Sequence, residues 1–196
     1  MELKGKRALV VGLGRSGVAS AFFLQDRGAK VTVSDAKSEA QLQNEITALL
    51  DRGVSIETGR HGERTFRDQD LIVVSPGVPS DQPQLQQARA LGIPVIGEVE
   101  LAFRFLEGKV IAITGSNGKT TTTTLVGEIL VKSGKKTLVG GNIGTPVISL
   151  IPKSTSGTLT YGAVPPGGVT NWITVEEVST EGAEGQTKTL RLPSAP

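Results

Sequence analysis

The stretch from Lys6 to Asp35, KRALVVGLGRSGVASAFFLQDRGAKVTVSD, decides the fold of the first part of the chain. An apolar run, Lys6–Val11, leads into a glycine-rich turn, and a segment with helical spacing follows at Val18–Leu24 and ends at Gly28. A second apolar run occupies Lys30–Asp35. A strand, a glycine turn, a helix and a strand within about 30 residues predict a βαβ unit, with parallel strands and a right-handed crossover.

The glycine-rich turn matches G-x-G-x-x-G at Gly12, Gly14 and Gly17. In this motif the first glycine makes a tight turn, the second lets the backbone approach a ligand, and the third packs helix on strand. The helix start then faces an anion, and Asp35 can accept a hydrogen bond from a ribose hydroxyl. Taken alone, the motif favours NAD; the alternatives are another ligand with a diphosphate and a ribose, or a turn that serves packing only.

Strand and helix patterns continue to alternate as far as Gly108, where we predict a domain boundary. The further predicted elements are an amphipathic helix with Leu42, Ile46, Leu49 and Leu50, a short strand with Val54 and Ile56, a buried strand at Leu71–Ser75, a helix at Pro83–Leu91, a strand at Ile93–Gly97 and a bridging helix at Glu98–Gly108. Residues 1–107 are therefore predicted to form an α/β, Rossmann-like domain with a parallel sheet.

A second phosphate-type loop lies in VIAITGSNGKTTTTTLVGEIL, Val110–Leu130. It is a variant of the P-loop, because the first glycine of that motif is missing. Its backbone N–H groups are expected to cradle phosphates, Lys119 to reach the β and γ phosphates, and the Thr120 or Thr121 hydroxyl to bind Mg²⁺. The alternative is a threonine-rich helix cap. Two phosphate loops imply two phosphorylated ligands, which favours an ATP-using enzyme over a dehydrogenase.

Composition narrows the classes of partner. The formal net charge is +2 with 20% charged residues, so nothing indicates a nucleic-acid or membrane-surface role. The chain has no cysteine, no apolar stretch long enough to span a membrane and no signal-peptide pattern, and we expect a cytoplasmic protein. His61, the one histidine, is interpreted as a solvated loop residue.

The last part of the chain changes in composition. From Ile151 onward, Gly, Pro, Thr and Ser make up 23 of 46 residues and no helical period is sustained. Such a composition is poor core material. We therefore expect residues 152–196 to be an atypical, poorly ordered tail, left by a truncated or frame-shifted end.

Five motifs together resemble the Mur ligase family, and within it the branch that adds D-glutamate. They are VVGLGRSG (Val10–Gly17), VSPGVP (Val74–Pro79), IGEVELAF (Ile96–Phe103), ITGSNGKTTTTTLVGEIL (Ile113–Leu130) and GGNIGTP (Gly140–Pro146). The similarity runs from Lys4 to about Ile151, so residues 108–151 would be the start of the central, P-loop-type α/β domain that binds ATP.

The resemblance implies an ATP-dependent amide ligase of peptidoglycan synthesis. ATP would phosphorylate the alanine carboxylate of UDP-N-acetylmuramoyl-L-alanine, and the D-glutamate amine would displace the phosphate. The implied ATP and Mg²⁺ site comprises Gly115, Ser116, Asn117, Gly118, Lys119, Thr120 and Thr121, with Lys119 catalytic and Thr120 on the metal. The implied substrate site comprises Arg15 and Ser16 at the diphosphate, Asp35 and Lys37 at the uridine, Ser75, Pro76 and Gly77 at the same nucleotide, and Asn142 near the reacting centre.

The chain also departs from the family pattern. Family members are more than twice as long and continue into a metal-binding glutamate stretch and a third domain. VEEVST (Val175–Thr180) resembles that stretch, which makes Glu177 a metal candidate, although it comes later than the family spacing. We expect the chain as given to be inactive as a ligase; the alternatives are a UDP-sugar and ATP binding module without catalysis, or an NAD-dependent oxidoreductase.

Overall fold

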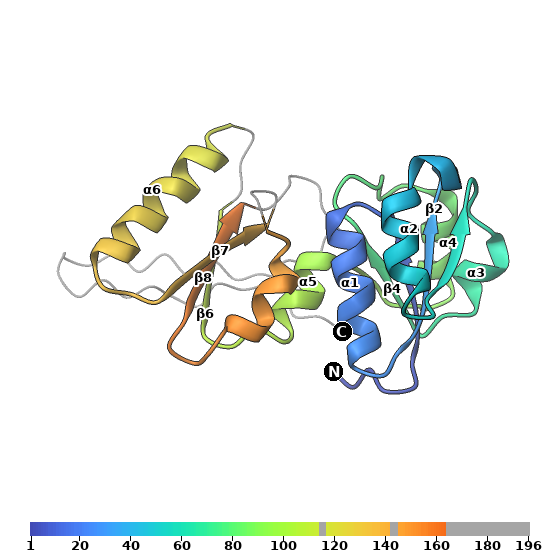
Figure 1. Ribbon diagram of the computed structural model, residues 1–196, viewed down its shortest axis with the longest axis horizontal. Coiled ribbons are helices and arrows are strands. Elements are labelled where there is room, and N and C mark those ends of the chain that lie inside the picture. Colours follow the sequence, from blue (N-terminus) through green and yellow to red (C-terminus); the bar gives the residue numbers. More distant parts are fainter. Residues whose placement is uncertain (114–116, 142–144, 164–196) are drawn as a thin grey trace.

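The computed structural model of the protein describes residues 1–113, 117–141 and 145–163 (Figure 1). The first sheet contains β1 (Arg7–Val11), β2 (Lys30–Asp35), β3 (Ser55–Thr58), β4 (Leu71–Val74) and β5 (Val95–Gly97), and the second contains β6 (Lys109–Ile113), β7 (Thr137–Gly141) and β8 (Leu159–Ala163). The helices are α1 (Arg15–Asp26), α2 (Gln43–Leu50), α3 (Glu63–Arg67), α4 (Pro83–Ala90), α5 (Glu98–Phe103) and α6 (Lys119–Lys132), with 3₁₀ helices η1 (Glu39–Gln41) and η2 (Val147–Lys153).

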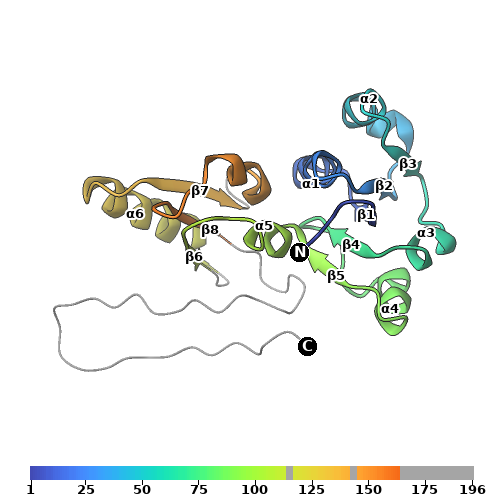
Figure 2. The same cartoon turned by 90° about the horizontal axis from the view of Figure 1, so that it is seen from below.

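The first sheet is parallel throughout, in the order β3-β2-β1-β4-β5. Alternate residues of β1 enter different cores: Ala8 and Val10 join an apolar cluster with α1, α2 and α5, whereas Leu9 and Val11 join one with α3 and α4. Figure 2 shows these helices on opposite faces of the sheet. A parallel sheet covered on both faces is the arrangement expected of βαβ units, and the predicted α/β fold is confirmed.

The second sheet is smaller and has the order β6-β8-β7, again with parallel pairing. In Figure 2, α6 lies on one face of this sheet and η2 on the other. The outer side of α6 remains open to solvent, with Leu125 and Ile129 exposed by 58% and 63%; Val131, near the end of the helix, is 61% exposed. The second unit thus buries its apolar residues less completely than the first.

Helix η2 connects the two units by packing on both. Val147, Ile148 and Ile151 belong to the same apolar cluster as α1 and α5 of the first unit. On the other side, a Cβ added to Gly140 of β7 would lie 2.6 Å from the Leu150 side chain, so β7 and η2 are in close contact. Residues that follow the second sheet's β7 in sequence therefore complete the core of the first unit.

Most predicted elements are present, and the helices differ from the prediction in three places. Leu50, predicted on the apolar face of its helix, is 57% exposed, because α2 ends there and its core side is already filled by Ile46 and Leu49. The bridging helix is shorter than predicted and ends at Phe103. Helix α3 was missed because five residues are too few for a helical period to appear in the sequence.

The predicted tail needs correction in its first part. Residues 159–163 form β8, the middle strand of the second sheet, which pairs with β6 on one side and β7 on the other. This strand could not be recognised in the sequence, because a short strand bordered by Gly, Ser and Thr has no distinctive period. Residues 164–196 lie outside the described residues, and the division at 107 and 151 stays a prediction. Within the described ranges, no helix is long and apolar enough to cross a membrane.

Candidate functional site

The carboxyl ends of β1, β2 and β4 bring the predicted substrate-binding segments together. From β1 the chain moves outward to β2 and β3 on one side, then returns to β4 on the other side of β1. In an open parallel sheet, this reversal creates a crevice at the carboxyl edge where ligands bind. Three segments lie at this edge: the turn after β1 with the first residues of α1, Arg15 and Ser16, then Asp35–Lys37, and Ser75–Gly77.

The three motif glycines occupy different environments. Gly12 has φ +90°, and a Cβ there would lie 2.6 Å from the Val78 side chain. A Cβ on Gly17 would lie 1.9 Å from the Gly12 carbonyl oxygen, a separation that excludes any side chain. Gly14 has nothing within 4 Å of the corresponding position. The predicted tight turn at Gly12 and close packing at Gly17 are confirmed, and the side left open at Gly14 is where a ligand could approach the backbone.

Asp35 shapes this loop. Its Oδ2 accepts a hydrogen bond from the Leu13 backbone N–H at 2.6 Å, and its Oδ1 accepts one from the Lys37 N–H at 2.8 Å. Each carboxylate oxygen has a second lone pair, so the side chain retains acceptor capacity toward a ligand hydroxyl. The sequence pointed to Asp35 as a ligand contact but not to its role in holding the loop.

Ser75 connects β4 to the same loop from the other side. Its hydroxyl is buried and donates a 2.7 Å hydrogen bond to the Gly12 carbonyl oxygen. The one hydroxyl proton is therefore used inside the protein. Pro76 and Gly77, next in the chain, are exposed, and Gly77 has φ +93°. The predicted contact of these three residues with a nucleotide stays a prediction.

The positively charged residues of the site lie on its surface. Arg15 is exposed at the first position of α1, Ser16 beside it is half-buried, and Lys37 is exposed after β2. Arg15 also lines a cavity of about 580 Å³ between α1, α2 and η2. Cations near a helix start favour a bound anion, so this edge suits a diphosphate.

Part of the predicted ATP loop lies within the described residues. Gly118 precedes α6 with φ +76°, a conformation that favours glycine, and Lys119 is the first residue of the helix. Asn117, Thr120 and Thr121 are exposed, so their polar groups are accessible at the start of α6. Further along the helix, Thr123 is buried, and the Thr124 hydroxyl donates to the Thr120 carbonyl at 3.0 Å.

Several predicted site residues cannot be placed. Gly115, Ser116, Asn142 and Glu177 lie outside the described residues. Within residues 1–113, 117–141 and 145–163, no group of three His, Asp or Glu side chains is arranged to hold a metal ion. The Thr120 hydroxyl stays a predicted metal ligand, with no such group around it in the part of the chain that is described.

His61 differs from its interpretation as a solvated loop residue. It is half-buried, its Nδ1 lies 2.8 Å from the Ser34 hydroxyl oxygen, and its ring packs edge-on against Phe66. The Ser34 hydroxyl also donates to Glu57 Oε2 at 3.2 Å. Because a hydroxyl has one proton, both contacts fit a histidine that carries its proton on Nδ1. This network orders the turn after β3, and no local sequence pattern indicated it.

Glu98 was missed as a residue of special interest. It follows β5, is only 2% exposed, and its Oε1 accepts a 2.7 Å hydrogen bond from the Ile148 backbone N–H. Burial raises the pKa of Glu98 to about 7, although the backbone N–H groups of Ile148 and Val147 act in the opposite direction. The signal available in the sequence was a carboxylate directly after the short apolar strand Val95–Gly97.

Comparison with known proteins matches residues 6–97 to the Mur ligase MurD-like, N-terminal domain. UDP-N-acetylmuramoylalanine–D-glutamate ligase of Koribacter versatilis is 75% identical over 76% of this chain and 33% of its own length. The enzyme of the same name from Acidobacterium capsulatum is 62% identical over 79% of this chain and 33% of its own length. Among solved structures, a pseudomurein peptide ligase type C from Methanothermus fervidus matches with a TM-score of 0.47 and 24% identity, over 85% of this chain and 34% of that one. The chain spans about a third of the length of the curated relatives it matches.

Proposed function

Because residues 6–97 form a MurD-like N-terminal domain of the Mur ligase family, we propose that this chain is the nucleotide-binding part of an ATP-dependent amide ligase. The proposed reaction joins the amine of D-glutamate to the alanine carboxylate of UDP-N-acetylmuramoyl-L-alanine, with ADP and phosphate as the other products. The names of the two bacterial relatives support this pair of substrates. The family resemblance found in the sequence is confirmed.

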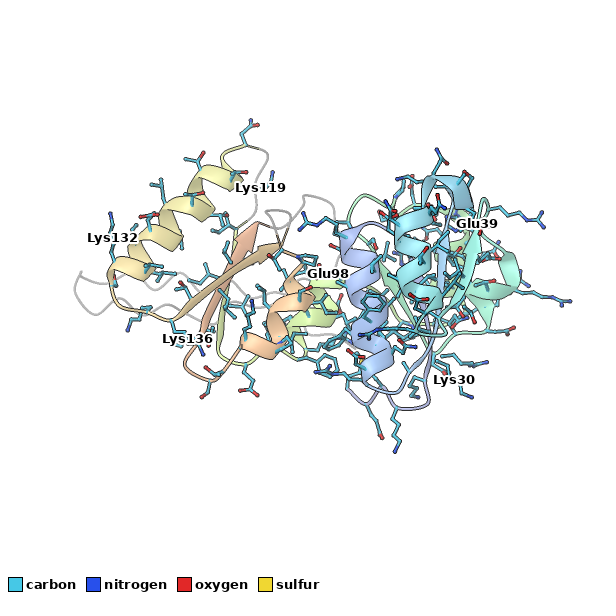
Figure 3. The ribbon with its side chains drawn as sticks, viewed as in Figure 1. Lys30, Glu39, Glu98, Lys119, Lys132 and Lys136 are labelled. Carbon is cyan, nitrogen blue, oxygen red and sulfur yellow. The ribbon has the colours of Figure 1, made fainter. Side chains whose placement is uncertain are left out.

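The observation that carries the proposal is that the end of β2, beside the first predicted loop, and the start of α6, after the second, lie on the same side of the molecule. In Figure 3, Lys30 at the start of β2 and Lys136 just before β7 lie at the lower side of the view. Glu39, after the end of β2, and Lys119, at the start of α6, lie at the upper side. The strands of both sheets therefore point their carboxyl ends in one direction. A reaction between a UDP-linked acid and ATP requires this arrangement.

The residues of the first loop suit the UDP end of the substrate. The open side of Gly14 leaves room for a diphosphate beside backbone N–H groups, and the exposed Arg15 guanidinium can neutralise it. Asp35 keeps acceptor capacity toward a hydroxyl of the nucleoside. We assign the same nucleotide contacts to Ser16, Lys37 and the Ser75–Gly77 segment, and we assign Asn142 to the reacting end of the substrate.

The residues at the start of α6 suit ATP. The helix N-terminus offers backbone N–H groups to a phosphate, and Lys119 adds a cation at the first helical position. ATP supplies the phosphoryl group that makes the carboxylate reactive toward an amine. Mg²⁺ is part of the proposal through Thr120 and through Glu177, which lies outside the described residues.

The proposal places the protein in the cytoplasm, in cell-wall growth and cell division. Two alternatives remain for the test to exclude. An NAD-dependent oxidoreductase is favoured by the glycine motif with Asp35, which could accept from a ribose hydroxyl of NAD as well as from one of UDP, but such an enzyme has no need of a second phosphate-type loop. A module that binds UDP-sugar and ATP without catalysis would use the same two loops.

Titration calorimetry with UDP, ATP–Mg²⁺ and NAD separates these functions. We expect UDP and ATP–Mg²⁺ to bind at separate sites, each without displacing the other, and NAD not to bind. Binding of NAD with no binding of UDP would contradict the proposal and support the oxidoreductase. We expect no phosphate release from this chain with UDP-N-acetylmuramoyl-L-alanine, D-glutamate and ATP, because we expect it to be inactive as a ligase; release that depends on both substrates would show an active ligase.

A further inference from the structure

We propose that Glu98 is a positioning residue, whose buried carboxylate fixes the second unit against the first through the start of η2. One consequence of this inference, the alignment of two nucleotide sites, rests on the proposed function. The contact itself does not depend on that function. Figure 3 shows Glu98 between α5 and η2, where the two units meet.

The first observation is the cost of placing a carboxylate there. Glu98 is the first residue of α5 and has 2% of its surface exposed. A charged side chain in such a place is strongly unfavourable unless hydrogen bonds replace its lost water. Burial is also the largest influence on the pKa of this carboxyl group. An apolar side chain at this position would avoid the cost of burying a carboxylate. The presence of a hydrogen-bond acceptor here therefore needs a structural reason.

The second observation is where the hydrogen bonds come from. Ile148 donates its backbone N–H to Glu98 Oε1 at 2.7 Å, across 50 positions of sequence, and the Val147 N–H contributes as well. These are the first N–H groups of η2, which have no partner inside their own helix. Its preceding residue, Pro146, supplies no side-chain cap. Glu98 therefore caps η2 from the other unit.

The third observation is that apolar packing alone leaves the position of η2 less defined. Val147, Ile148 and Ile151 pack into the first core, while Leu150 lies against β7. Apolar contacts have no preferred direction, whereas hydrogen bonds to adjacent N–H groups require a narrow geometry. The Glu98 carboxylate thus selects one position of η2, and with it one position of β7 and the second sheet.

This position matters because the two loops belong to different units. The Gly12–Ser16 loop is held by β1, β2 and β4 of the first unit, and Lys119 is held by the second. Reacting groups held in place by different domains react efficiently only when the domains are correctly aligned. A residue that fixes this alignment affects the reaction without touching a substrate.

The chain has no cysteine, which permits a direct measurement of the alignment. Spin labels on Glu39→Cys and Lys132→Cys report the distance between the units by pulsed electron paramagnetic resonance. Both positions are exposed and lie in different units. A second pair, Glu39→Cys and Asp81→Cys, reports on the first unit alone. Each pair is measured with native Glu98, with Glu98→Gln, which keeps an acceptor oxygen, and with Glu98→Ala, which does not.

We expect a single narrow distance between the units in the native protein and in Glu98→Gln, and loss of that distance in Glu98→Ala. The pair inside the first unit should be unchanged throughout. Glu100→Ala is the matched control, because Glu100 lies on the same helix but pairs with Arg104 within the first unit. We expect the inter-unit distance to survive this change.

Three results would overturn the inference. They are an unchanged inter-unit distance in Glu98→Ala, equal loss in Glu98→Gln or Glu100→Ala, and a change within the first unit in Glu98→Ala, which would show that Glu98 serves the folding of that unit. Calorimetry with UDP on the native protein tests the proposed function separately. Failure of UDP to bind would reject that function and leave the distance result standing.

Discussion

The Asp35 carboxylate accepts a 2.6 Å hydrogen bond from the backbone N–H of Leu13, inside the loop that carries the glycine motif. An aspartate at the end of the second strand is usually considered a ligand contact. Here the same side chain also fixes the loop that would surround the ligand. Changes at Asp35 therefore act on UDP binding in two ways, through a contact and through the shape of the loop.

Asp35→Ala should weaken UDP binding by roughly 1.5 to 3 kcal/mol, the range for loss of a charged hydrogen bond. It should also lower the free energy of unfolding, because the Leu13 and Lys37 N–H groups lose their acceptor. Asp35→Asn keeps an acceptor oxygen and should recover most of the stability but less of the affinity. Calorimetry and denaturant unfolding measure the two effects, and an affinity unchanged in both variants would remove Asp35 from the site.

Gly14 and Gly17 form a matched pair for separating binding from folding. Gly17→Ala places a methyl group 1.9 Å from the Gly12 carbonyl oxygen, and the backbone must move. We expect destabilisation of about 1 to 3 kcal/mol, as for other overpacked sites. Gly14→Ala adds its methyl group in open space at φ −71°, so unfolding should change by less than about 0.5 kcal/mol.

For UDP binding, the larger effect should come from Gly14→Ala. The Gly14 methyl group would stand where the diphosphate approaches, and UDP affinity should fall on the order of tenfold, about 1.4 kcal/mol. Full UDP affinity in a stable Gly14→Ala protein would show that the ligand does not approach the backbone there.

Lys119→Ala should abolish ATP binding and leave UDP binding intact, because the two loops lie in different units. Lys132→Ala is the control: it removes a lysine of the same helix at the opposite end, where the side chain is exposed and pairs weakly with Glu128 at 3.9 Å. Calorimetry with both nucleotides gives the answer. Parallel loss of UDP and ATP binding in Lys119→Ala would indicate unfolding instead of a lost phosphate contact.

The parts of the fold that could be predicted are those with strong local signals. Strand β2 was predicted with its observed bounds, because Gly28 ends the preceding helix and a short apolar run follows it. The roles of Gly12 and Gly17 followed from the spacing of one motif, since only glycine fits such close contacts. The two nucleotide-binding loops rest on the same kind of reasoning and stay predictions.

The remaining features depend on residues that are distant in sequence. Glu98 meets Ile148 across 50 positions, and Ser75 meets Gly12 across 63. No periodicity or spacing in the sequence indicates such pairs, because the two segments meet only in the folded protein. Strand β8 was missed for a related reason, because its stability comes from two neighbouring strands and not from its own composition.

The stability of the protein should depend on pH through Glu98. Burial raises the pKa of this carboxyl group from 4.5 to about 7, whereas in the unfolded chain it stays near 4.5. Between these values the folded protein holds a proton that the unfolded chain has released, so stability is highest below the unfolded pKa and falls as pH rises through the folded one. The loss is on the order of 3 kcal/mol when Glu98 is fully ionised.

Glu98→Gln should remove this dependence. Denaturant unfolding at pH 5 and pH 8 should show the variant close to the native protein at the lower pH and more stable at the higher one. Glu128→Gln, which removes an exposed carboxylate, is the control and should leave the pH dependence unchanged. A native protein with equal stability at both pH values would contradict the raised pKa of Glu98.

The exposed side of α6 should make the protein associate. Leu125 and Ile129 lie one turn apart on the same side of this helix and are 58% and 63% exposed. Contiguous apolar surface of this kind is uncommon on a monomer and favours contact with another apolar surface. Sedimentation velocity over a range of protein concentrations should reveal species larger than the monomer.

The double variant Leu125→Lys and Ile129→Glu should shift the distribution to monomer without lowering the free energy of unfolding, because neither side chain is buried. Leu130→Lys changes a half-buried neighbour on the same helix and should lower stability instead. A native protein that stays monomeric at all concentrations would show that this surface does not drive association.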